Sequence, residues 1–346
     1  MNASPYGLFL TAPRELELRA LVLSPLHPGE ALVRVAGCGL CHTDIGFYSG
    51  AVRTRHELPL VLGHEIAGVV EDVAGPQGQL VGRQVLVPAV MPCGTCDLCE
   101  GGRALACQHQ LMPGNDMGGG FATHIVVPAN MLVPLPDDLG THSLAELSVI
   151  SDAVTTPYQA IQRACVNPGD LVIVVGIGGI GTYAVQIARA LDAHVAAIDV
   201  DEEKVRRAAL LGAEWQFNAR ETDGRAIKKK LLAQSGVSTA RWRILEMSGT
   251  AAGQELAWSL LPPAGTLGIV GFTMDKVSVR LSNLMALDAT AFGNWGCAPA
   301  HYPAVVDLVL SGRVQLKPFV ELHDLKEGPA LFADGAHAGR RAVLVP

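Results

Sequence analysis

Residues 171–191, LVIVVGIGGIGTYAVQIARAL, decide the fold of the second half of this chain. The apolar run 171–175 predicts a buried parallel strand, and a glycine-rich turn connects it to a helix that begins near residue 182. This order of strand, GxGxxG turn and helix is typical of dinucleotide binding, because the glycines let the backbone approach a pyrophosphate at the positive N-terminus of the helix. The alternative is another α/β domain, such as a flavodoxin-like one, in which the turn binds nothing. The turn residues expected at the pyrophosphate are Gly176, Gly178, Gly179, Ile180 and Gly181.

The strand that follows ends at Asp199, eighteen residues after Gly181. A carboxylate at this point accepts hydrogen bonds from the adenosine ribose hydroxyls and repels a 2′-phosphate. No arginine stands beside Asp199, where the next residues are Val200, Asp201 and Glu202. NAD is therefore favoured over NADP as the cofactor.

Later segments extend the cofactor prediction. Strand-like and helix-like segments alternate over residues 151–296, which indicates βαβ units and a parallel sheet. Ligands of such sheets bind at the carboxyl ends of the strands. We expect the nicotinamide side of the cofactor at residues that follow two later strands and at an asparagine near the end of this domain: Ser248, Gly249, Val270, Gly271, Phe272 and Asn294.

The remaining segments have a different pattern of apolar residues and turns. Residues 1–150 consist of short strand-like segments punctuated by Pro-Gly and Gly-rich turns, which indicates a β-rich domain. The closing residues contain a helix-like segment and an apolar terminal strand that returns to that domain. The predicted fold class is α/β, with a β-rich domain at 1–150, a doubly wound dinucleotide-binding domain at 151–296 and a C-terminal segment at 297–346.

The composition excludes several classes of protein. Of 346 residues, 49% are hydrophobic and 17% are charged, which suffices for ordinary buried cores in roughly two domains. No uninterrupted apolar stretch is long enough to span a membrane, and a net charge of −7 argues against nucleic acid as a partner. The N-terminal residues lack the basic and apolar regions of a secretory signal, so the eight cysteines indicate a reducing cytoplasm.

Four of those cysteines have the spacing Cys93-x2-Cys96-x2-Cys99-x7-Cys107. Thiolates at such intervals on a short loop can converge on one tetrahedral zinc ion, and a site closed by four protein ligands is structural. The alternatives are disulfides, which need an oxidising compartment, and buried thiols that only pack. The other isolated cysteines and histidines without partners at ligand spacing are expected to be packing or surface residues: Cys38, Cys165, Cys297, His109, His124, His301, His323 and His337.

A second set of metal-binding residue types lies in Cys41-His42-Thr43-Asp44 and in Gly63-His64-Glu65. One cysteine, one histidine and a later cysteine or carboxylate suit a catalytic zinc ion that keeps its fourth position open. The simpler alternatives are that Cys41 is a small buried residue, that Thr43 satisfies a turn, and that Asp152 caps the helix that follows it.

Together, the Cys-His-Thr-Asp and Gly-His-Glu motifs, the four-cysteine loop and the glycine-rich turn resemble the zinc-dependent medium-chain alcohol dehydrogenases. The four motifs occur in the order of that family and span essentially the whole chain. The resemblance implies a GroES-like catalytic domain and a Rossmann NAD-binding domain. It also implies one catalytic and one structural zinc ion per subunit, and hydride transfer between an alcohol and nicotinamide.

The resemblance assigns the catalytic residues one by one. It implies that Cys41 and His64 bind the catalytic zinc ion, and that Asp152 is the third ligand, where many members have cysteine. Glu65 matches a carboxylate that lies near the metal and can bind it transiently. Asp44 matches the residue that orients His64 by accepting its other ring proton.

Other matched positions imply a proton relay and cofactor contacts. The hydroxyl of Thr43 is expected to face the alcohol oxygen and relay its proton. Many relatives complete this relay with a histidine where this chain has Gly46, so the nicotinamide ribose, water or another residue must release the proton. His42 is expected at a cofactor phosphate. Arg341 is expected at the pyrophosphate, with the adjacent Arg340 as the alternative.

Several further segments, such as LMPGNDMGGGFATHIVVPA at 111–129, resemble a narrower branch of the family. This branch is the 6-hydroxycyclohex-1-ene-1-carbonyl-CoA dehydrogenases of anaerobic benzoyl-CoA degradation. It implies NAD-dependent oxidation of the ring hydroxyl of a cyclic unsaturated acyl-CoA to a ketone. Arg53 and Arg55 are candidates for the CoA phosphates unless both are simply solvated. Asn115 and Asp116 either line the mouth of the site or only form a turn.

The alternatives remain open at this point. The same zinc and cofactor sites can oxidise a simpler primary or secondary alcohol or a polyol. The length of the substrate pocket and cationic residues at its entrance would distinguish an acyl-CoA substrate from these simpler ones. A metal-free enone or quinone reductase is disfavoured by Cys41, His64 and the four-cysteine loop. A non-catalytic NAD-binding sensor would be favoured by a catalytic position that is empty or closed with four protein ligands. By resemblance, we expect a homo-oligomer, a tetramer or a dimer, with a small-molecule substrate and neither nucleic acid nor a membrane as partner.

Overall fold

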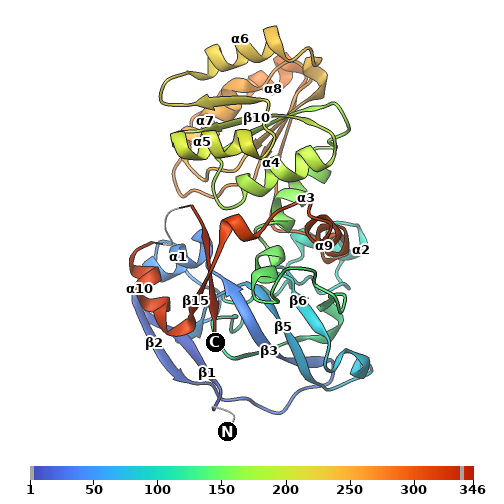
Figure 1. Cartoon of the computed structure of the whole chain (residues 1–346), viewed down its shortest axis with the longest axis vertical. Helices are drawn as coiled ribbons and strands as arrows, with labels where there is room; N and C mark the ends of the chain where they lie inside the picture. Colours follow the sequence, from blue (N-terminus) through green and yellow to red (C-terminus); the bar gives the residue numbers. More distant parts are fainter. Residues whose placement is uncertain (1–3, 336–338) are drawn as a thin grey trace. The chain divides into compact units, whose positions relative to one another are not determined.

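The structure is a computed structural model that describes residues 4–335 and 339–346, so His337 lies outside the described residues. The chain forms two compact units (Figure 1). Unit 1 comprises the residues up to Thr155 together with Gly296–Leu310 and Gln315–Pro346, and unit 2 comprises Thr156–Trp295 with Ser311–Val314. Relative to the expected boundaries, residues 151–155 and Gly296 belong to unit 1, and the short segment 311–314 belongs to unit 2.

Unit 2 is built on a six-stranded sheet in which each neighbouring pair of strands is parallel. The central strand reads LVIVV, and all five side chains are buried, as expected for a strand covered on both faces. The predicted doubly wound parallel sheet is confirmed. Across the sheet, the strands are β11 (Trp215–Asn218), β10 (His194–Asp199), β9 (Leu171–Val175), β12 (Trp242–Glu246), β13 (Thr266–Ile269) and β14 (Thr290–Gly293).

Helices α4 (Gly181–Ala190), α5 (Glu202–Leu210) and α7 (Ala251–Leu260) pack against this sheet, and α6 (Gly224–Gln234) packs against α7 (Figure 1). Capping residues fix where two of them begin. Asp201 accepts hydrogen bonds from the amides that open α5, and Thr250 accepts one from the amide of Gly253 in α7. Because these caps follow β10 and β12 closely, they fix the turns at the carboxyl edge of the sheet.

The order of strands changes direction at β9, which lies between β10 and β12. Val175 at the end of β9 pairs with Ile198 of β10 on one side and with Glu246 of β12 on the other. In doubly wound sheets a ligand binds at such a switch point, outside the carboxyl ends of the strands. The register therefore brings the turns after β9, β10 and β12 to one edge, where the sequence predicts the cofactor.

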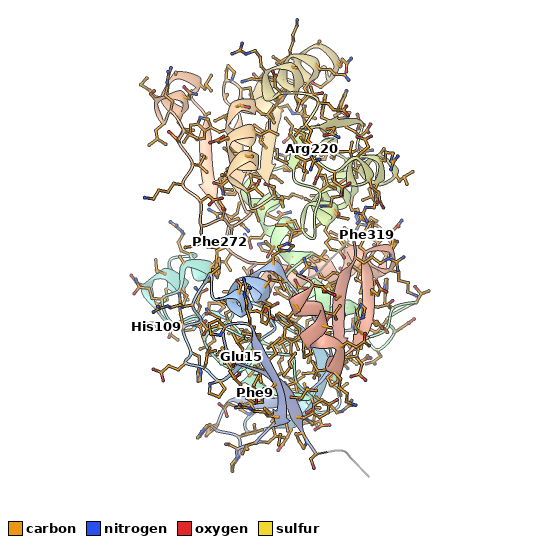
Figure 2. All side chains as sticks on the ribbon, turned by 90° about the vertical axis from the view of Figure 1, so that its left-hand side faces the viewer. Phe9, Glu15, His109, Arg220, Phe272 and Phe319 are labelled. Carbon is orange, nitrogen blue, oxygen red and sulfur yellow. The ribbon has the colours of Figure 1, made fainter. Side chains whose placement is uncertain are left out.

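Unit 1 is mainly antiparallel. Strands β3 and β5 pair with Gly39 opposite Glu65, so the end of β3 and the start of β5 lie side by side. The edge strand β2 presents charged residues such as Glu15 to solvent (Figure 2), which protects that edge from pairing with another chain. One sheet has the order β2 (Glu15–Ala20), β1 (Tyr6–Ala12), β4 (Leu60–Val61); the other has β15 (Val320–Asp324), β16 (Arg341–Val345), β3 (Glu30–Gly39), β5 (Glu65–Val73), β6 (Gln84–Val87), β8 (Val133–Pro134), with β7 (His124–Pro128) also on β3.

Short helices complete the chain and carry several of the predicted site residues. No helix of residues 4–335 and 339–346 is long and apolar enough to cross a membrane. Ser151 ends the 3-10 segment η4, and α3 begins shortly after it. These elements are α1 (His42–Ser49), α2 (Asp97–Glu100), η4 (Glu146–Ser151), α3 (Thr155–Arg163), α8 (Ser282–Leu287), α9 (Tyr302–Leu310) and α10 (Gly328–Ala333).

Candidate active site and zinc loop

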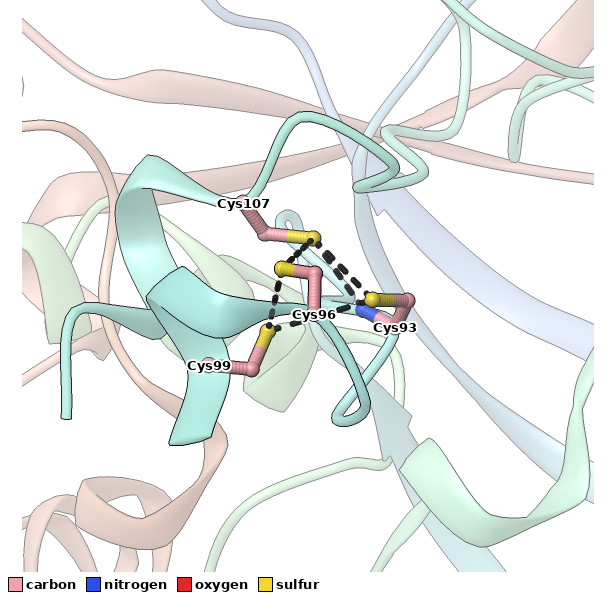
Figure 3. Close-up of side chains that lie close together, drawn as sticks. All are labelled: Cys93, Cys96, Cys99 and Cys107. Carbon is pink, nitrogen blue, oxygen red and sulfur yellow. Dashed lines mark hydrogen bonds between the residues drawn. The ribbon is translucent and has the colours of Figure 1, made fainter. Parts of the chain in front are cut away.

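The four cysteines of the predicted structural site converge on one loop of unit 1 (Figure 3). The Sγ atom of Cys96 lies 3.5 Å from that of Cys99 and 3.7 Å from that of Cys107. The Sγ atom of Cys93 lies 3.5 Å from that of Cys107 and 4.0 Å from that of Cys99. Four sulfurs at about 2.3 Å from one zinc ion in a tetrahedron are about 3.8 Å apart, so this group fits zinc. The separations are too long for disulfides, in which the sulfurs are about 2.0 Å apart.

The surroundings of these sulfurs favour thiolates beside a cation. The amides of Cys93 and His109 both donate hydrogen bonds to the sulfur of Cys107. A hydrogen bond from the amide of Thr95 is the main reason that the pKa of the Cys93 thiol falls to about 6. Burial, together with the neighbouring thiols, raises the pKa of Cys99 to about 12. At neutral pH the Cys99 thiol therefore becomes a thiolate only beside a positive ion.

The second candidate metal centre is assembled from three separate segments of unit 1. Cys41 follows β3, His64 and Glu65 stand at the start of β5, and Asp152 follows η4. One ligand atom of each residue lies within 4.8 Å of the ligand atoms of the others. The first three residues are buried, whereas the side chain of Asp152 is 17% exposed. The structure thus brings together the residues that the sequence predicts as ligands of a catalytic zinc ion.

Asp44 connects the two motifs that supply these ligands. Its carboxylate is fully buried and accepts hydrogen bonds from the amides of Cys41, at 2.9 Å, and Gly63, at 3.2 Å. The Oδ1 atom also lies 3.3 Å from Nδ1 of His64, and Nε2 on the other side of that ring lies 3.7 Å from Oδ2 of Asp152. Asp44 therefore fixes both backbone segments and orients the imidazole, so that its second nitrogen faces the ligand group.

Neighbouring charges determine the protonation of the ligands. Burial by itself lowers the pKa of His64, but the carboxylates of Asp44 and Asp152 raise it well above its ordinary value. Burial raises the pKa of the Cys41 thiol, yet the hydrogen bond with His64 and the charge of Arg341 bring it below its ordinary value. The acidic groups thus stabilise positive charge at the centre of the cluster, which fits a divalent cation held by thiolate, imidazole and carboxylate.

Glu65 and Arg341 form a buried ion pair beside these ligands. The Nη1 atom of Arg341 donates to Oε1 of Glu65 at 2.6 Å, and the two side chains are 8% and 0% exposed. The Oε2 atom of Glu65 accepts no hydrogen bond from the described residues, and burial raises the pKa of this carboxyl. Gly39 makes room for it, because a Cβ there would lie 2.1 Å from Oε2. The expected contact of Arg341 with a pyrophosphate stays a prediction; its pairing with Glu65 was not anticipated.

The residues expected around the alcohol and the cofactor phosphate occupy different environments. The Oγ1 atom of Thr43 lies 3.8 Å from the sulfur of Cys41, so the hydroxyl stands beside the ligand group as a relay requires. His42 opens α1 and is exposed. The position of Gly46, in the same helix, has only Val52 within reach of an added Cβ, at 3.6 Å. The relay beyond Thr43 therefore has no side chain at the position where many relatives have histidine.

In unit 2, the residue expected at the ribose also holds the glycine-rich turn. The carboxylate of Asp199 accepts hydrogen bonds from the amides of Ile177, at 2.7 Å, and Asp201, at 3.0 Å. A Cβ at Gly181 would lie 1.8 Å from the carbonyl oxygen of Gly176, so a larger residue cannot occupy this helix start. Gly178, by contrast, faces open space within 4 Å. The turn is thus tightly packed at Gly181, and it leaves free space at Gly178, where we expect the pyrophosphate.

Sequence reasoning missed Glu246, the last residue of β12. Its buried carboxylate accepts hydrogen bonds from the amide of Ser248, at 2.7 Å, from the hydroxyl of the same residue, and from the amide of Gly249, at 3.2 Å. Its backbone carbonyl accepts the amides of Val270 and Gly271. Glu246 therefore holds both strand-end turns that the sequence predicts at the nicotinamide side. An acidic residue that directly follows the apolar pair Ile244-Leu245 at the end of the strand is the signal that could have found it.

Two further residues predicted at the nicotinamide side, Phe272 and Asn294, lie on loops that follow strands of unit 2. The side chain of Phe272, 65% exposed, extends from the loop after β13 (Figure 2). Asn294 follows β14, and its Nδ2 atom donates to the carbonyl of Thr156 at 3.4 Å. Their roles toward the cofactor stay predictions.

The two arginines considered for CoA phosphates differ in their ion pairs. The guanidinium of Arg55 pairs with Asp116 at 3.2 Å, and its amide donates to the side chain of Asn115 at 3.0 Å. Arg53 is exposed and makes no ion pair with the described residues. Asn115 and Asp116 therefore anchor the arginine loop, which leaves Arg53 as the free cation of the pair.

Comparison with known proteins identifies both halves of the chain. The family model for the alcohol dehydrogenase GroES-like domain matches residues 27–137, and the one for zinc-binding dehydrogenases matches residues 179–311. An alcohol dehydrogenase of Geobacillus stearothermophilus is 31% identical over 317 residues, which cover 91% of this chain and 90% of the relative. A D-arabinose 1-dehydrogenase (NADP(+)) of Saccharolobus solfataricus is 29% identical over 330 residues, with the same coverage of 91% and 90%.

A solved structure agrees with these sequence matches. The alcohol dehydrogenase of the hyperthermophilic archaeon Aeropyrum pernix superposes with a TM-score of 0.87 and 29% identity, covering 99% of this chain and 100% of that one. The predicted combination of a GroES-like domain and a Rossmann domain is confirmed. The chain belongs to the zinc-dependent alcohol dehydrogenase family and is an oxidoreductase that uses a nicotinamide dinucleotide.

Proposed function

We propose that this enzyme oxidises a simple alcohol or polyol with NAD, using a zinc ion held by Cys41, His64 and Asp152. The observation that carries the proposal is the convergence of these ligand atoms, with Glu65, within 4.8 Å of one another. Three protein ligands leave the open position that a catalytic zinc ion needs for its substrate. We assign a second, structural zinc ion to the four-cysteine loop, which gives two ions per subunit.

The residues around this site have distinct duties. When bound, the zinc ion supplies a Lewis acid that lowers the pKa of the alcohol hydroxyl, and the nicotinamide supplies the hydride acceptor. The hydroxyl of Thr43 accepts the proton of the substrate and passes it to water or the cofactor ribose. Asp44 holds His64 in place from its far side. The thiolate of Cys41 and the carboxylate of Asp152 balance a divalent charge, so aspartate in place of cysteine leaves the charge of the ligand set unchanged.

We infer that NAD is preferred over NADP. The support is Asp199, which ends β10 and is followed by the acidic residues Asp201 and Glu202, the latter bound to Asn218 at 3.1 Å. A 2′-phosphate placed beside this carboxylate would meet like charge, which costs several kcal/mol and so about 100-fold or more in kcat/KM. Measuring kcat/KM with both cofactors for the wild type and Asp199→Ser tests this inference. Equal use of both cofactors by the wild type would contradict it.

An acyl-CoA with a ring hydroxyl is the second candidate substrate. The observation in its favour is Arg53, an exposed cation on the loop after α1 that makes no ion pair with the described residues. Against it, Arg55 already pairs with Asp116. The relatives described above are named for alcohols and a sugar, which favours the simpler substrates.

Steady-state NADH formation with ethanol, sorbitol, cyclohexanol and 6-hydroxycyclohex-1-ene-1-carbonyl-CoA separates these candidates. Turnover of the simple alcohols, abolished in Cys41→Ala, is the expected result. Turnover confined to the thioester and weakened in Arg53→Gln would favour the acyl-CoA. A protein that binds NAD and two zinc ions but turns over none of these substrates would contradict the dehydrogenase proposal and favour a sensor.

We also propose that the enzyme forms a homo-oligomer through unit 2. Strand β14 is an edge strand whose residues are exposed or half-buried. At the helix that precedes it, Leu281 is 69% and Met285 is 79% exposed. An unpaired edge beside exposed apolar side chains is a template for pairing with a second copy. Analytical ultracentrifugation should show a dimer or tetramer that dissociates in Met285→Lys, and a monomeric wild type would contradict the proposal.

We place the enzyme in the cytoplasm. All eight cysteines are free of disulfides, and the four on the zinc loop must stay reduced to bind a metal. Cell fractionation with an antibody against the chain tests this assignment, and recovery from an oxidising compartment would contradict it.

A further inference from the structure

The segment that carries Asp152 is fixed by a buried tyrosine from a distant part of unit 1. Tyr302, the first residue of α9, is completely buried. Its hydroxyl donates a hydrogen bond to the carbonyl of Ser151 at 2.5 Å and accepts one from the amide of Ala89 at 3.2 Å. The carbonyl carbon of Ser151 is bonded to the nitrogen of Asp152, so this contact acts on the peptide unit that carries the third zinc ligand.

A second hydrogen bond fixes the same segment from the strand of the other ligands. The hydroxyl of Ser151 donates to the carbonyl of Ile66 in β5 at 2.9 Å. Ile66 directly follows Glu65 and lies two residues after His64. Ser151 is completely buried, so neither of these two hydrogen bonds competes with water. The ligand segment is therefore tied on one side to β5 and on the other to α9.

The chemistry of the third ligand explains why this segment must be held. The ligand oxygen of an aspartate lies one bond farther from Cα than the sulfur of a cysteine, so the backbone must sit farther from the ion than in relatives with cysteine. The backbone of Asp152 has φ −143° and ψ −57°, outside the helical region, and therefore takes no support from a regular helix. The position of the carboxylate is thus set by what holds its backbone.

We propose that Tyr302 is a positioning residue for the catalytic zinc ion: it holds Ser151 and Asp152 so that the carboxylate reaches the metal. This inference rests on the proposed role of Asp152 as third ligand. A tyrosine that only stabilised unit 1 would have a different signature, because the four-cysteine zinc site lies in the same unit and serves as an internal reference. General loosening of unit 1 would release both ions faster, whereas loss of positioning would release only one.

The test is the rate at which the holoprotein releases zinc to a chelator, followed with a zinc-sensitive dye. Substitutions of residues that orient metal ligands weaken metal affinity about 10–100-fold. We expect one of the two ions of Tyr302→Phe to leave about 10–100-fold faster, while the other leaves at the wild-type rate. Ser151→Ala, which removes the bond to Ile66 without adding volume, should shift the same ion in the same direction. Tyr183→Phe, an equally buried tyrosine of unit 2, should change neither rate.

Cys41→Ala and Cys99→Ser identify which ion is which, because each removes a ligand of one site. Equal acceleration of both ions in Tyr302→Phe, or of neither, would overturn the positioning role. If Tyr302→Phe does not fold, Ser151→Ala takes its place as the test. Unchanged zinc release from that variant would mean that holding Ser151 does not position Asp152, which would overturn the role of Tyr302. Asp152→Ala distinguishes failure of the proposed zinc ligand from failure of the positioning role of Tyr302. Wild-type release from that variant would overturn the proposed zinc ligand together with this inference, whereas fast release from Asp152→Ala but not from Tyr302→Phe would overturn the inference alone.

Discussion

The two candidate zinc sites of unit 1 are built in opposite ways. The four-cysteine site takes all its ligands from residues 93–107, three of them partly exposed, and needs little more than its own loop. The mixed site takes its ligands from Cys41, His64 and Asp152, which come together only when β3, β5 and η4 pack. Around it lie a buried carboxylate and a buried ion pair that the zinc loop lacks. The comparison shows that a structural metal site can be local, whereas a catalytic one needs a preorganised core.

The largest effect that separates the two sites is expected from Cys41→Ala. Loss of the Lewis acid removes several kcal/mol of transition-state stabilisation, so kcat/KM should fall about 1,000-fold or more. Zinc content should fall from two ions to one per subunit. Steady-state kinetics and metal analysis measure both quantities. Cys165→Ala, which replaces an exposed thiol of unit 2, is the matched control and should behave like the wild type. Equal losses of kcat/KM and zinc in the two variants would contradict the assignment of Cys41 to a catalytic zinc site.

Cys99→Ser should affect stability rather than chemistry. Removing a structural metal is among the few changes that cost more than about 4 kcal/mol, which lowers the melting temperature by about 10 °C in a protein of this size class. Thermal unfolding measures this shift. Turnover per active site at low temperature should remain close to the wild-type value. Immediate loss of turnover in the folded variant would show that the zinc loop serves the chemistry directly.

The buried ion pair beside the catalytic ligands predicts a third effect. Arg341→Met leaves the carboxylate of Glu65 buried without its cation, and breaking such a pair costs about 3–5 kcal/mol. Arg340→Met, at the exposed neighbouring position, should stay within about 0.5 kcal/mol of the wild type. Denaturant unfolding of the two variants measures the difference. Equal stability would mean that the pair does not hold the catalytic site together.

The smallest effect concerns Glu246, which holds the cofactor turns of unit 2 as Asp44 holds the ligands of unit 1. Burial raises the pKa of Glu246 above its ordinary value of 4.5, so the folded protein binds a proton more readily than the unfolded chain. The stability contributed by this group is therefore present below the ordinary pKa and is lost as the pH rises through the raised one. Glu246→Gln removes that part of the slope of unfolding free energy against pH.

Urea unfolding at a series of pH values measures this slope. Glu255→Gln, an exposed glutamate on α7, is the control and should keep the wild-type slope. A slope in Glu246→Gln that matches the wild type would show that the carboxylate is equally easy to protonate in the folded and unfolded chain.

The same contrast between local and assembled features explains what the sequence could predict. The strand at 171–175, its glycine-rich turn and the four-cysteine loop were predictable because each depends on residues close together in the chain. The catalytic ligands were assigned through resemblance, and the fold was then needed to bring them together. The pairing of Arg341 with Glu65 and the contact of Tyr302 with Ser151 join segments far apart in the chain. No spacing rule connects such positions, so only the packing of β16 and α9 reveals them.

The zinc site at Asp152 is best tested by metal analysis of Asp152→Ala beside the wild type and Glu65→Ala, after dialysis of the folded proteins. We expect two zinc ions per subunit in the wild type and in Glu65→Ala, but one in Asp152→Ala, with dehydrogenase turnover lost in that variant. Two ions and full turnover in Asp152→Ala would contradict the central claim that this carboxylate completes a catalytic zinc site.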